Sequence, residues 1–337
     1  MKRFLTIVAA LVLALNLSAK DNGKIMPKSD LRPDKTVYLY VPAKANLKKI
    51  AKELSPVVGK KAETLALEMA ENSGITAPEE IFDPNGATRN ISDYARFDLY
   101  FPKNPNGQMV VVCPGGGYGC VCEYIEGLYA AEWLVSQGIT VAVVKYRLPN
   151  GHASIPLTDV QEVFRYCRKH QGEWGVTSVG VMGSSAGGHL AASASVLYDD
   201  AVTRPDFSIL IYPVTSFKES YGHAYCGAQL LGSEEDMSAA EYKRLSYKFE
   251  VCNHVSFDTP PTYIVLGADD AEVNPLNSIT YFQKLLECKV PAEMHIFKHG
   301  THGFSFESSK YTDNDLLGDA RDDFYNSLSR WLNSLAK

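Results

Sequence analysis

Residues 183–188 read Gly-Ser-Ser-Ala-Gly-Gly and follow the strand-like run Val-Gly-Val-Met at 179–182. This G-x-S-x-G pattern is centred on Ser185, and an Ala-rich helical segment follows it. Glycines two residues on either side of a serine let a strand and a helix approach closely, so that the serine sits on a sharp, strained turn. The pattern therefore predicts a nucleophile at Ser185. A Gly/Ser-rich turn without chemistry is the alternative, because the motif alone also occurs by chance.

A second glycine run follows another predicted strand. Residues 114–118 read Pro-Gly-Gly-Gly-Tyr directly after the apolar run at 109–113. Such a run offers backbone N–H groups to a ligand, and with the N–H of Ala186 it predicts an oxyanion hole for a developing negative oxygen. A plain turn is the alternative, which the serine motif about 70 residues later disfavours.

An acidic pair and a histidine follow two later strand-like runs. Asp269 and Asp270 come just after the run at 262–266, and His302 lies in a loop after the run at 293–297. The carboxyl ends of parallel strands meet at one edge of a sheet. A histidine that accepts the serine proton and a carboxylate that orients this histidine complete a catalytic triad. The serine, the acid and the histidine, each just past a strand, together predict nucleophilic catalysis.

Two cofactor-binding interpretations of the glycine runs fail. His189 and Leu190 stand where a phosphate-binding loop needs Lys and Ser or Thr, and Cys120 stands at the third glycine of a dinucleotide fingerprint. His189, in the first turns of the predicted helix, is expected to be a structural hydrogen-bonding residue.

A metal site is also not expected. His295, His299 and His302 form an H-x3-H-x2-H series, but His295 lies on a predicted strand, and neither H-E-x-x-H nor a CxxC pair is present. The predicted triad chemistry needs no cofactor.

Strands alternating with helices must position these residues. Several strand-like runs, such as 109–112, are continuously apolar, as in a sheet covered on both faces. The alternation predicts an α/β fold whose mostly parallel sheet has helices on both faces. Strands are expected at 36–41, 97–101, 109–113, 139–145, 179–182, 207–212, 262–266 and 293–297, and helices at about 122–136, 157–170, 187–198, 277–288 and 316–335.

The chain divides into three predicted parts. The first nineteen residues pair Lys2 and Arg3 with an apolar run and end at Ala19, as in a signal peptide. Residues 20–86 contain two short helical patterns and too few large apolar residues for a core, so they predict a small helical extension packed on the main domain. Residues 87–337 form the predicted catalytic domain, with an insertion at about 214–260 that is a candidate cap or lid.

Export and charge limit the partners. Cleavage near Ala19 would deliver the protein to the periplasm or the medium, and no cysteine follows Ala19 to carry a lipid anchor. The net charge of −6 gives no electrostatic footprint for nucleic acid or anionic lipid. The seven scattered cysteines are interpreted mainly as small core residues, with any pairing left open, and the oligomeric state is not predicted.

From about residue 91 to its end, the chain resembles the α/β-hydrolase esterases that deacetylate xylan and related plant polysaccharides, a carbohydrate acetylesterase group related to the hormone-sensitive-lipase-like branch. The resemblance rests on motifs at 114–118, 126–127, 145–149, 183–190, 204–207, 230–232, 260–261, 269–270 and 302–304.

This resemblance implies Ser185, Asp270 and His302 as the triad, with Gly116, Gly117 and Ala186 as oxyanion donors. Asp270 is preferred to Asp269 because in this fold the acid follows the glycine that ends the strand by three positions. Ser184 departs from the bulky residue usual in the group, and 271–275 departs from its usual proline and valine, so the resemblance says less about the choice of substrate than about the triad.

The function expected is that of an exported serine esterase acting on short acyl esters, with acetylated carbohydrate as substrate. A generic carboxylesterase and a prolyl-oligopeptidase-type peptidase are the alternatives. Residues 20–86 are too few for the large N-terminal domain that such peptidases normally carry. A catalytically inactive binding protein is disfavoured because the serine, acid and histidine motifs are all intact.

Overall fold

The computed structural model describes residues 29–39, 61, 81–82, 87–89, 95–217, 220–235, 237–306 and 315–335. The predicted signal peptide at 1–19 and the helical patterns predicted within 20–86 lie outside these residues. The described parts of the extension include β1 (Lys35–Tyr38) and β2 (Ile81–Phe82), and β2 pairs antiparallel with β3 (Thr88–Arg89).

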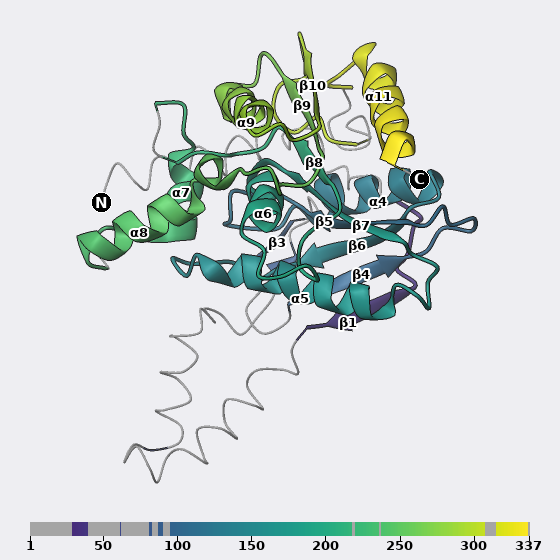
Figure 1. Ribbon diagram of the computed structural model, residues 1–337, viewed down its shortest axis with the longest axis horizontal. Helices are drawn as coiled ribbons and strands as arrows, with labels where there is room; N and C mark the ends of the chain where they lie inside the picture. The colour runs from purple at the N-terminus through teal and green to yellow at the C-terminus, as the bar shows by residue number, and fades with distance from the viewer. Residues whose placement is uncertain are drawn as a thin grey trace, which may run out of the picture.

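An eight-stranded sheet, ordered β1-β4-β6-β5-β7-β8-β9-β10, forms the centre of the described structure (Figure 1). β4 pairs antiparallel with β1 and β6, and every other neighbouring pair is parallel. The predicted α/β class with a mostly parallel sheet is therefore confirmed. The strands not yet given are β4 (Arg96–Tyr100), β5 (Gln108–Cys113), β6 (Thr140–Lys145), β7 (Ser178–Ser184), β8 (Ser208–Ile211), β9 (Thr262–Gly267) and β10 (Ala292–Phe297).

Helices cover both faces of this sheet (Figure 1). α5 contacts α6 and β7 on one face. On the other face α4 meets α11, where the ring of Trp133 lies 5.5 Å from that of Tyr325 and 5.2 Å from that of Phe306. Apart from the start of α4, these helices match the predicted positions. They are α4 (Tyr129–Ser136), α5 (Ser154–His170), α6 (Ser185–Val196), α9 (Leu276–Glu287) and α11 (Ala320–Leu335).

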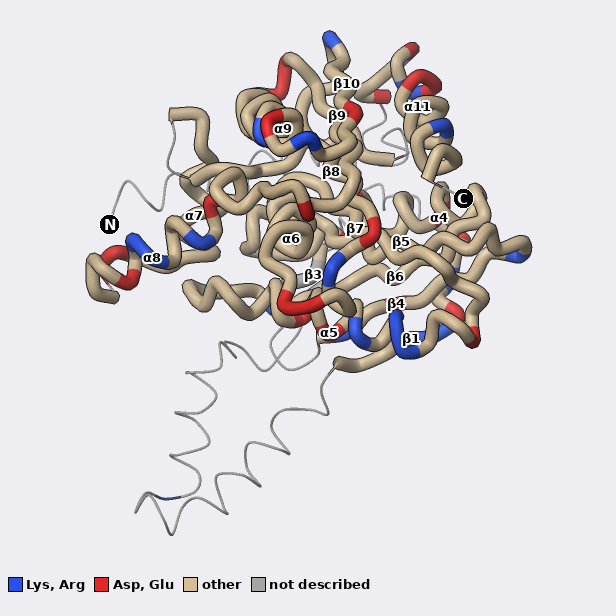
Figure 2. The backbone as a smooth tube through the Cα atoms, in the orientation of Figure 1, with Lys and Arg blue, Asp and Glu red and all other residues tan. Residues whose placement is uncertain are grey.

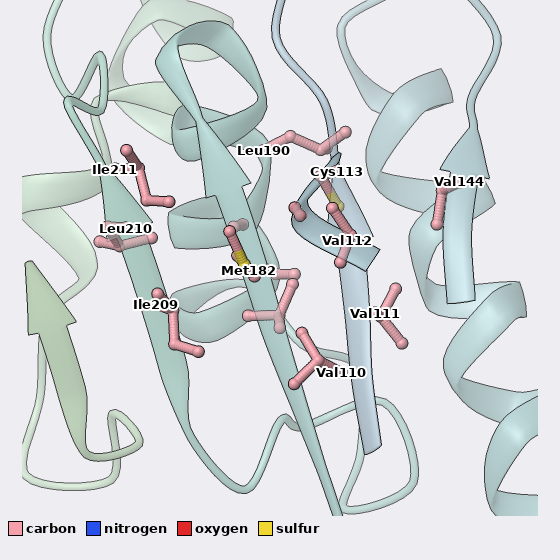
Figure 3. Packing of buried hydrophobic residues seen from close by; sticks show 14 of the residues in the cluster. Val110, Val111, Val112, Cys113, Val144, Met182, Leu190, Ile209, Leu210 and Ile211 are labelled. Atoms are coloured by element: carbon pink, nitrogen blue, oxygen red, sulfur yellow. The ribbon is translucent and has the colours of Figure 1, made fainter. Parts of the chain in front are cut away.

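The core lies between the central strands and these helices. β5, β7 and β8 contain no charged residue, and Figure 2 shows the charges concentrated on helices, loops and edge strands. Figure 3 shows side chains from all three strands packing together with Leu190 of α6. All six residues of β5 are buried, since both faces of that strand are covered.

The segment between β5 and α4 differs from the prediction. A single helix was expected from residue 122, whereas the chain first forms the π-helix η2 (Glu123–Leu128) and then α4. A π-helical turn inserts an extra residue into the helical ladder, and such turns are frequent at functional sites. Glu126, Gly127 and Leu128 are consequently buried.

The insertion between β8 and β9 is itself largely helical. It contains α7 (Ala224–Leu231), α8 (Ala239–Phe249) and the short 3-10 helix η3 (Val251–His254). His223 and Ser238 cap α7 and α8 by accepting backbone N–H groups. Leu230, Leu231 and Phe249 are buried in the same core as the sheet, so this segment packs on the domain.

In the described ranges, no helix has the length and apolar character that crossing a bilayer requires. Cys113, Cys120, Cys167 and Cys226 are buried, as small core residues would be.

Candidate active site

Ser185 lies at the turn from β7 into α6. Its φ is +54°, in the left-handed region that L-residues rarely adopt. The flanking glycines make this turn possible. A methyl group on Gly183 would overlap the backbone of Gly187, and one on Gly187 would overlap the carbonyl oxygen of Cys113. The serine pattern thus folds into the strained strand-to-helix turn that its spacing predicts.

The structure brings His302 and Asp270 together with Ser185. Nε2 of His302 lies 2.9 Å from Oγ of Ser185, and Nδ1 lies 2.8 Å from Oδ2 of Asp270. The three residues meet because β7, β8, β9 and β10 are parallel neighbours whose carboxyl ends share one edge. In this geometry Nδ1–H donates to Asp270, which leaves Nε2 able to accept the serine proton.

The carboxylate of Asp270 is fixed by the turn that follows it. Its side chain is fully buried. Oδ1 accepts the backbone N–H groups of Glu272 and Val273 at 3.0 and 2.9 Å. Oδ2 therefore accepts the Nδ1–H of His302. Because the carboxylate is fixed by these bonds, it also fixes the orientation of the imidazole ring.

Asp269 binds a different part of the site. Its Oδ1 accepts the backbone N–H of Thr301 at 2.8 Å, and Oδ2 lies 3.2 Å from Nδ1 of His299. The Thr301 hydrogen bond is the main reason that the pKa of Asp269 lies below its usual value. Asp269 thus anchors the loop that carries His302, a role that sequence reasoning missed. The acidic doublet itself was the available signal.

The predicted oxyanion donors lie beside the serine turn. Gly116 and Gly117 have φ values of +121° and +65°. The preceding glycine, Gly115, packs so closely that a methyl group on it would lie 2.9 Å from Cβ of Ser185. Ala186 is the second residue of α6, where a backbone N–H has no acceptor within its own helix. The glycine loop and the helix start therefore converge on the serine, where they can receive a negatively charged oxygen.

Glu126, the first residue of the 126–127 motif, is buried beside this glycine loop. Its position was not predicted to belong to the site. Its Oε2 accepts the backbone N–H of Gly115 at 2.5 Å, and its Oε1 accepts the hydroxyl of Tyr212 at 2.9 Å. An acidic residue on the apolar side of the helix after the glycine run was the signal that could have identified it.

His189 joins the glycine loop to the insertion. Nε2 lies 2.8 Å from the carbonyl oxygen of Phe249, and Nδ1 lies 2.8 Å from the hydroxyl of Tyr118. Burial lowers the pKa of His189 to about 4, so the ring is neutral, with Nε2–H donating to Phe249. The structural role expected for His189 is confirmed.

The insertion also forms part of the rim. The ring of Tyr225 lies where a side chain on Gly117 or Gly119 would project. Nε2 of His223 is 3.6 Å from Oε1 of Glu272, and this contact is the main cause of a lowered pKa for Glu272. The rim next to the glycine loop therefore combines an aromatic ring with a histidine that faces a carboxylate.

The three histidines considered as metal ligands have separate acidic partners. His295 binds Glu293, whereas His299 and His302 bind the two neighbouring aspartates described above. Within the described ranges, no group of three or more possible ligands gathers around a common point. A nucleophile, a base and an orienting acid in one hydrogen-bonded series suit acyl transfer.

Comparison with known proteins gives consistent matches. A family model described as alpha/beta hydrolase fold matches residues 122–306. The chain is 37% identical over 254 residues to an acetylxylan esterase of Xylanibacter ruminicola, covering 74% of this chain and 50% of that protein. It is 29% identical over 218 residues to endo-1,4-beta-xylanase B of Butyrivibrio fibrisolvens, covering 60% and 33%. The chain therefore spans half or less of the length of these curated relatives.

A solved structure is similar over most of its length. The crystal structure of an acetyl ester-xyloside bifunctional hydrolase from Caldicellulosiruptor lactoaceticus aligns with a TM-score of 0.61 and 30% identity. The alignment covers 72% of this chain and 88% of that one.

Proposed function

Because this chain belongs to the α/β-hydrolase family, as its motifs indicated, we propose that it is a serine carboxylic-ester hydrolase that removes acetyl groups from xylan or related plant polysaccharides. The observation that carries the proposal is the continuous hydrogen-bonded series from Asp270 through His302 to Ser185, with distances of 2.8 and 2.9 Å. This series ends on a serine held in a strained backbone conformation at a helix start.

In the proposed mechanism Ser185 attacks the acetyl carbonyl while His302 takes its proton. Asp270 stabilises the imidazolium that forms. The N–H groups of Gly116, Gly117 and Ala186 stabilise the negative oxygen of the tetrahedral intermediate. His302 then gives this proton to the departing sugar oxygen as the C–O bond breaks, so the sugar leaves as a free hydroxyl and an acetyl-enzyme remains.

Water completes the cycle. His302 takes a proton from a water molecule, which attacks the acetyl-enzyme and forms a second tetrahedral intermediate. This intermediate collapses to acetate, and the proton returns to Oγ of Ser185. Every step uses groups already present in the site.

The names of similar proteins support the choice of substrate. An acetylxylan esterase and an acetyl ester-xyloside hydrolase are among the most similar, and a xylanase also matches. The rim supports it as well, since Tyr225 and the Glu272–His223 pair offer stacking and hydrogen bonding, the two interactions that a sugar ring uses. In the described part of the insertion Leu230, Leu231 and Phe249 are buried in the core, and the exposed Tyr247 and Phe257 are too few for the broad apolar face of a lipid-binding lid.

Acetate release from acetylated xylan, with Ser185→Ala as the control, tests this function. We expect acetate with the unaltered protein and none with the variant. With p-nitrophenyl esters, kcat/KM is expected to fall steeply from acetyl to butyryl to octanoyl. Faster turnover of octanoyl esters would contradict an acetylesterase, and model-ester activity without acetate from any glycan would leave a generic carboxylesterase.

We further propose that the protein is exported, because its first nineteen residues have the pattern of a signal peptide. Expression of the full chain followed by cell fractionation and N-terminal sequencing tests this. Export predicts mature protein outside the cytoplasm with its N-terminus near residue 20. An intact N-terminus in the cytoplasm would contradict it.

A further inference from the structure

Glu126 is a buried carboxylate for which the triad mechanism has no use. It is 5% exposed and lies in the π-helix η2, between the glycine loop and α4. Its two hydrogen-bond donors, the Gly115 N–H and the Tyr212 hydroxyl, are both neutral. Burying a carboxylate in this way is unfavourable, so its presence calls for a role other than packing.

On one side Glu126 holds the loop that carries the predicted oxyanion donors. A methyl group on Gly115 would lie 2.5 Å from Oε2 of Glu126, 2.6 Å from the Ser184 carbonyl oxygen and 2.9 Å from Cβ of Ser185. The carboxylate, the first glycine of the loop and the serine turn are thus in direct contact. The Gly115 N–H is directed to Glu126, which fixes the peptide that precedes Gly116 and Gly117.

On its other side Glu126 reaches the histidine. Tyr212, whose hydroxyl binds Oε1, follows β8 and has a strained φ of +35°. Its ring centroid lies 4.7 Å from that of His302 and 4.8 Å from that of Phe304. The Glu126–Tyr212 bond therefore links the glycine loop to the side of the imidazole ring.

The charges around these residues favour the same role. Burial raises the pKa of Glu126, while the charge of His302 and the hydrogen bonds from Tyr212 and Gly115 act in the opposite direction. The carboxylates that act on His302 are those of Asp270, Glu272 and Glu126. In the proposed reaction this ring becomes positive, so a buried negative charge beside it stabilises the transition state more than the ground state.

We propose that Glu126 is a positioning residue that couples the two halves of the site, holding the oxyanion loop through Gly115 and the general base through Tyr212. The inference rests on the proposed esterase function. It concerns the chemical step, so it is tested with p-nitrophenyl acetate. A failure to deacetylate xylan would count against the proposed substrate and leave this test intact.

Glu126→Gln removes the charge and keeps an amide oxygen that accepts the Gly115 N–H, while its NH2 group donates to the Tyr212 hydroxyl in place of accepting from it. We expect kcat to fall about tenfold with KM changed less than twofold, since the lost interaction belongs to the transition state. The acidic limb of the kcat/KM profile should move to lower pH, because the variant lacks a negative charge that stabilises the positive form of the general base. Glu126→Ala also frees the loop and should lower kcat on the order of 10²-fold, as the loss of an oxyanion donor does.

Two further variants separate this role from a structural one. Glu123→Gln removes a carboxylate from the same π-helix, but that carboxylate binds Lys145 at 2.6 Å, so kcat and the pH profile should stay unchanged. Tyr212→Phe keeps the ring against His302 and removes the hydroxyl that binds Glu126. It should fold and lower kcat several-fold.

The outcomes decide between the two roles. A lower kcat and a shifted acidic limb in Glu126→Gln, both absent in Glu123→Gln, would support the proposal. Unchanged kcat and limb in Glu126→Gln, with only a lower Tm, would make Glu126 structural and overturn it. If Glu126→Gln does not fold, unaltered kinetics in Tyr212→Phe would overturn it equally.

Discussion

The serine turn (residues 183–187) and the histidine loop (residues 298–306) meet at the site, where Ser185 and His302 are hydrogen-bonded. Different interactions hold these two regions in place. The serine turn is buried and fixed by backbone contacts that leave no room for a methyl group at Gly183 or Gly187. The histidine loop is partly exposed, and a side chain on Gly303 would meet no neighbour. The side chains of Asp269 and Asp270 fix that loop through hydrogen bonds to Thr301 and His302.

This difference predicts how each region fails. A region fixed by steric contacts tolerates loss of a polar group but not added volume. A region fixed by hydrogen bonds tolerates added volume but not the loss of a partner. The nucleophile thus depends on close packing, and the base depends on two neighbouring carboxylates.

The largest effect is expected inside the serine turn, where two adjacent hydroxyls should differ completely. Ser185→Ala should lower kcat on the order of 10⁶-fold, the loss typical of a triad serine, with the fold intact. Ser184→Ala should keep most activity, because within the described structure its buried hydroxyl has no hydrogen-bond partner. Steady-state kinetics with p-nitrophenyl acetate measure both. An inactive Ser184→Ala beside an active Ser185→Ala would move the nucleophile by one residue.

The next effect separates the two carboxylates that bind the histidine loop, those of Asp269 and Asp270. Asp270→Asn should lower kcat on the order of 10⁴-fold, because an amide favours the wrong histidine tautomer. Asp269→Asn keeps an acceptor for the Thr301 N–H and should cost about tenfold or less. Matched kinetics and circular dichroism on both variants measure this. Equal losses would leave the acid unassigned, and the reverse order would identify Asp269 as the triad acid.

A pair of glycine substitutions compares the steric tolerance of the two regions. Gly187→Ala should lower the free energy of unfolding by about 3 kcal/mol, because its methyl group overlaps the Cys113 carbonyl. Gly303→Ala has open space but a φ of +84°, so it should lose only about 1 kcal/mol. Urea unfolding provides both values. Similar losses would show that the close contacts of Gly187 cost no more than the backbone strain at Gly303.

An effect on stability alone, confined to acidic pH, is expected from His189. Its folded pKa of about 4 lies below the usual 6.5, so the unfolded chain binds a proton that the folded chain excludes. Stability is then complete above pH 6.5 and is lost as the pH falls toward 4, by on the order of 3 kcal/mol. His189→Gln, which can hydrogen-bond both Tyr118 and Phe249, should flatten this slope in urea unfolding.

The exposed His299 is the matched control for this measurement. His299→Gln should leave the slope between pH 6.5 and 4 as in the unaltered protein. The same slope in His189→Gln as in the unaltered protein would mean that other groups produce the acid sensitivity.

Local sequence patterns predicted the serine turn and the order of strands and helices along the chain. Spacing alone dictates where Ser185 must sit, and continuously apolar strands such as β5 signal burial on both faces. The same apolar strands carry no information about their partners, so the order of strands in the sheet could not be predicted.

The contacts that position the site were not predictable, for a related reason. Glu126 and Tyr212 are 86 positions apart, and Asp269 and Thr301 are 32 apart. Neither spacing has a periodic signature, because these pairs meet only after the sheet has formed. The π-helix at Glu123–Leu128 also escaped prediction, since its apolar spacing matches an ordinary helix over one turn.

The contact between Trp133 and Phe306 makes the histidine loop visible by fluorescence. Phe306 lies four residues beyond His302, and its ring is 5.2 Å from the buried indole of Trp133. With Trp174 and Trp331, the other two tryptophans, replaced by phenylalanine, the remaining tryptophan emission would come from Trp133, which contacts Phe306 and Tyr325. Its spectrum and quenching would then report movement of the loop separately from unfolding of the sheet.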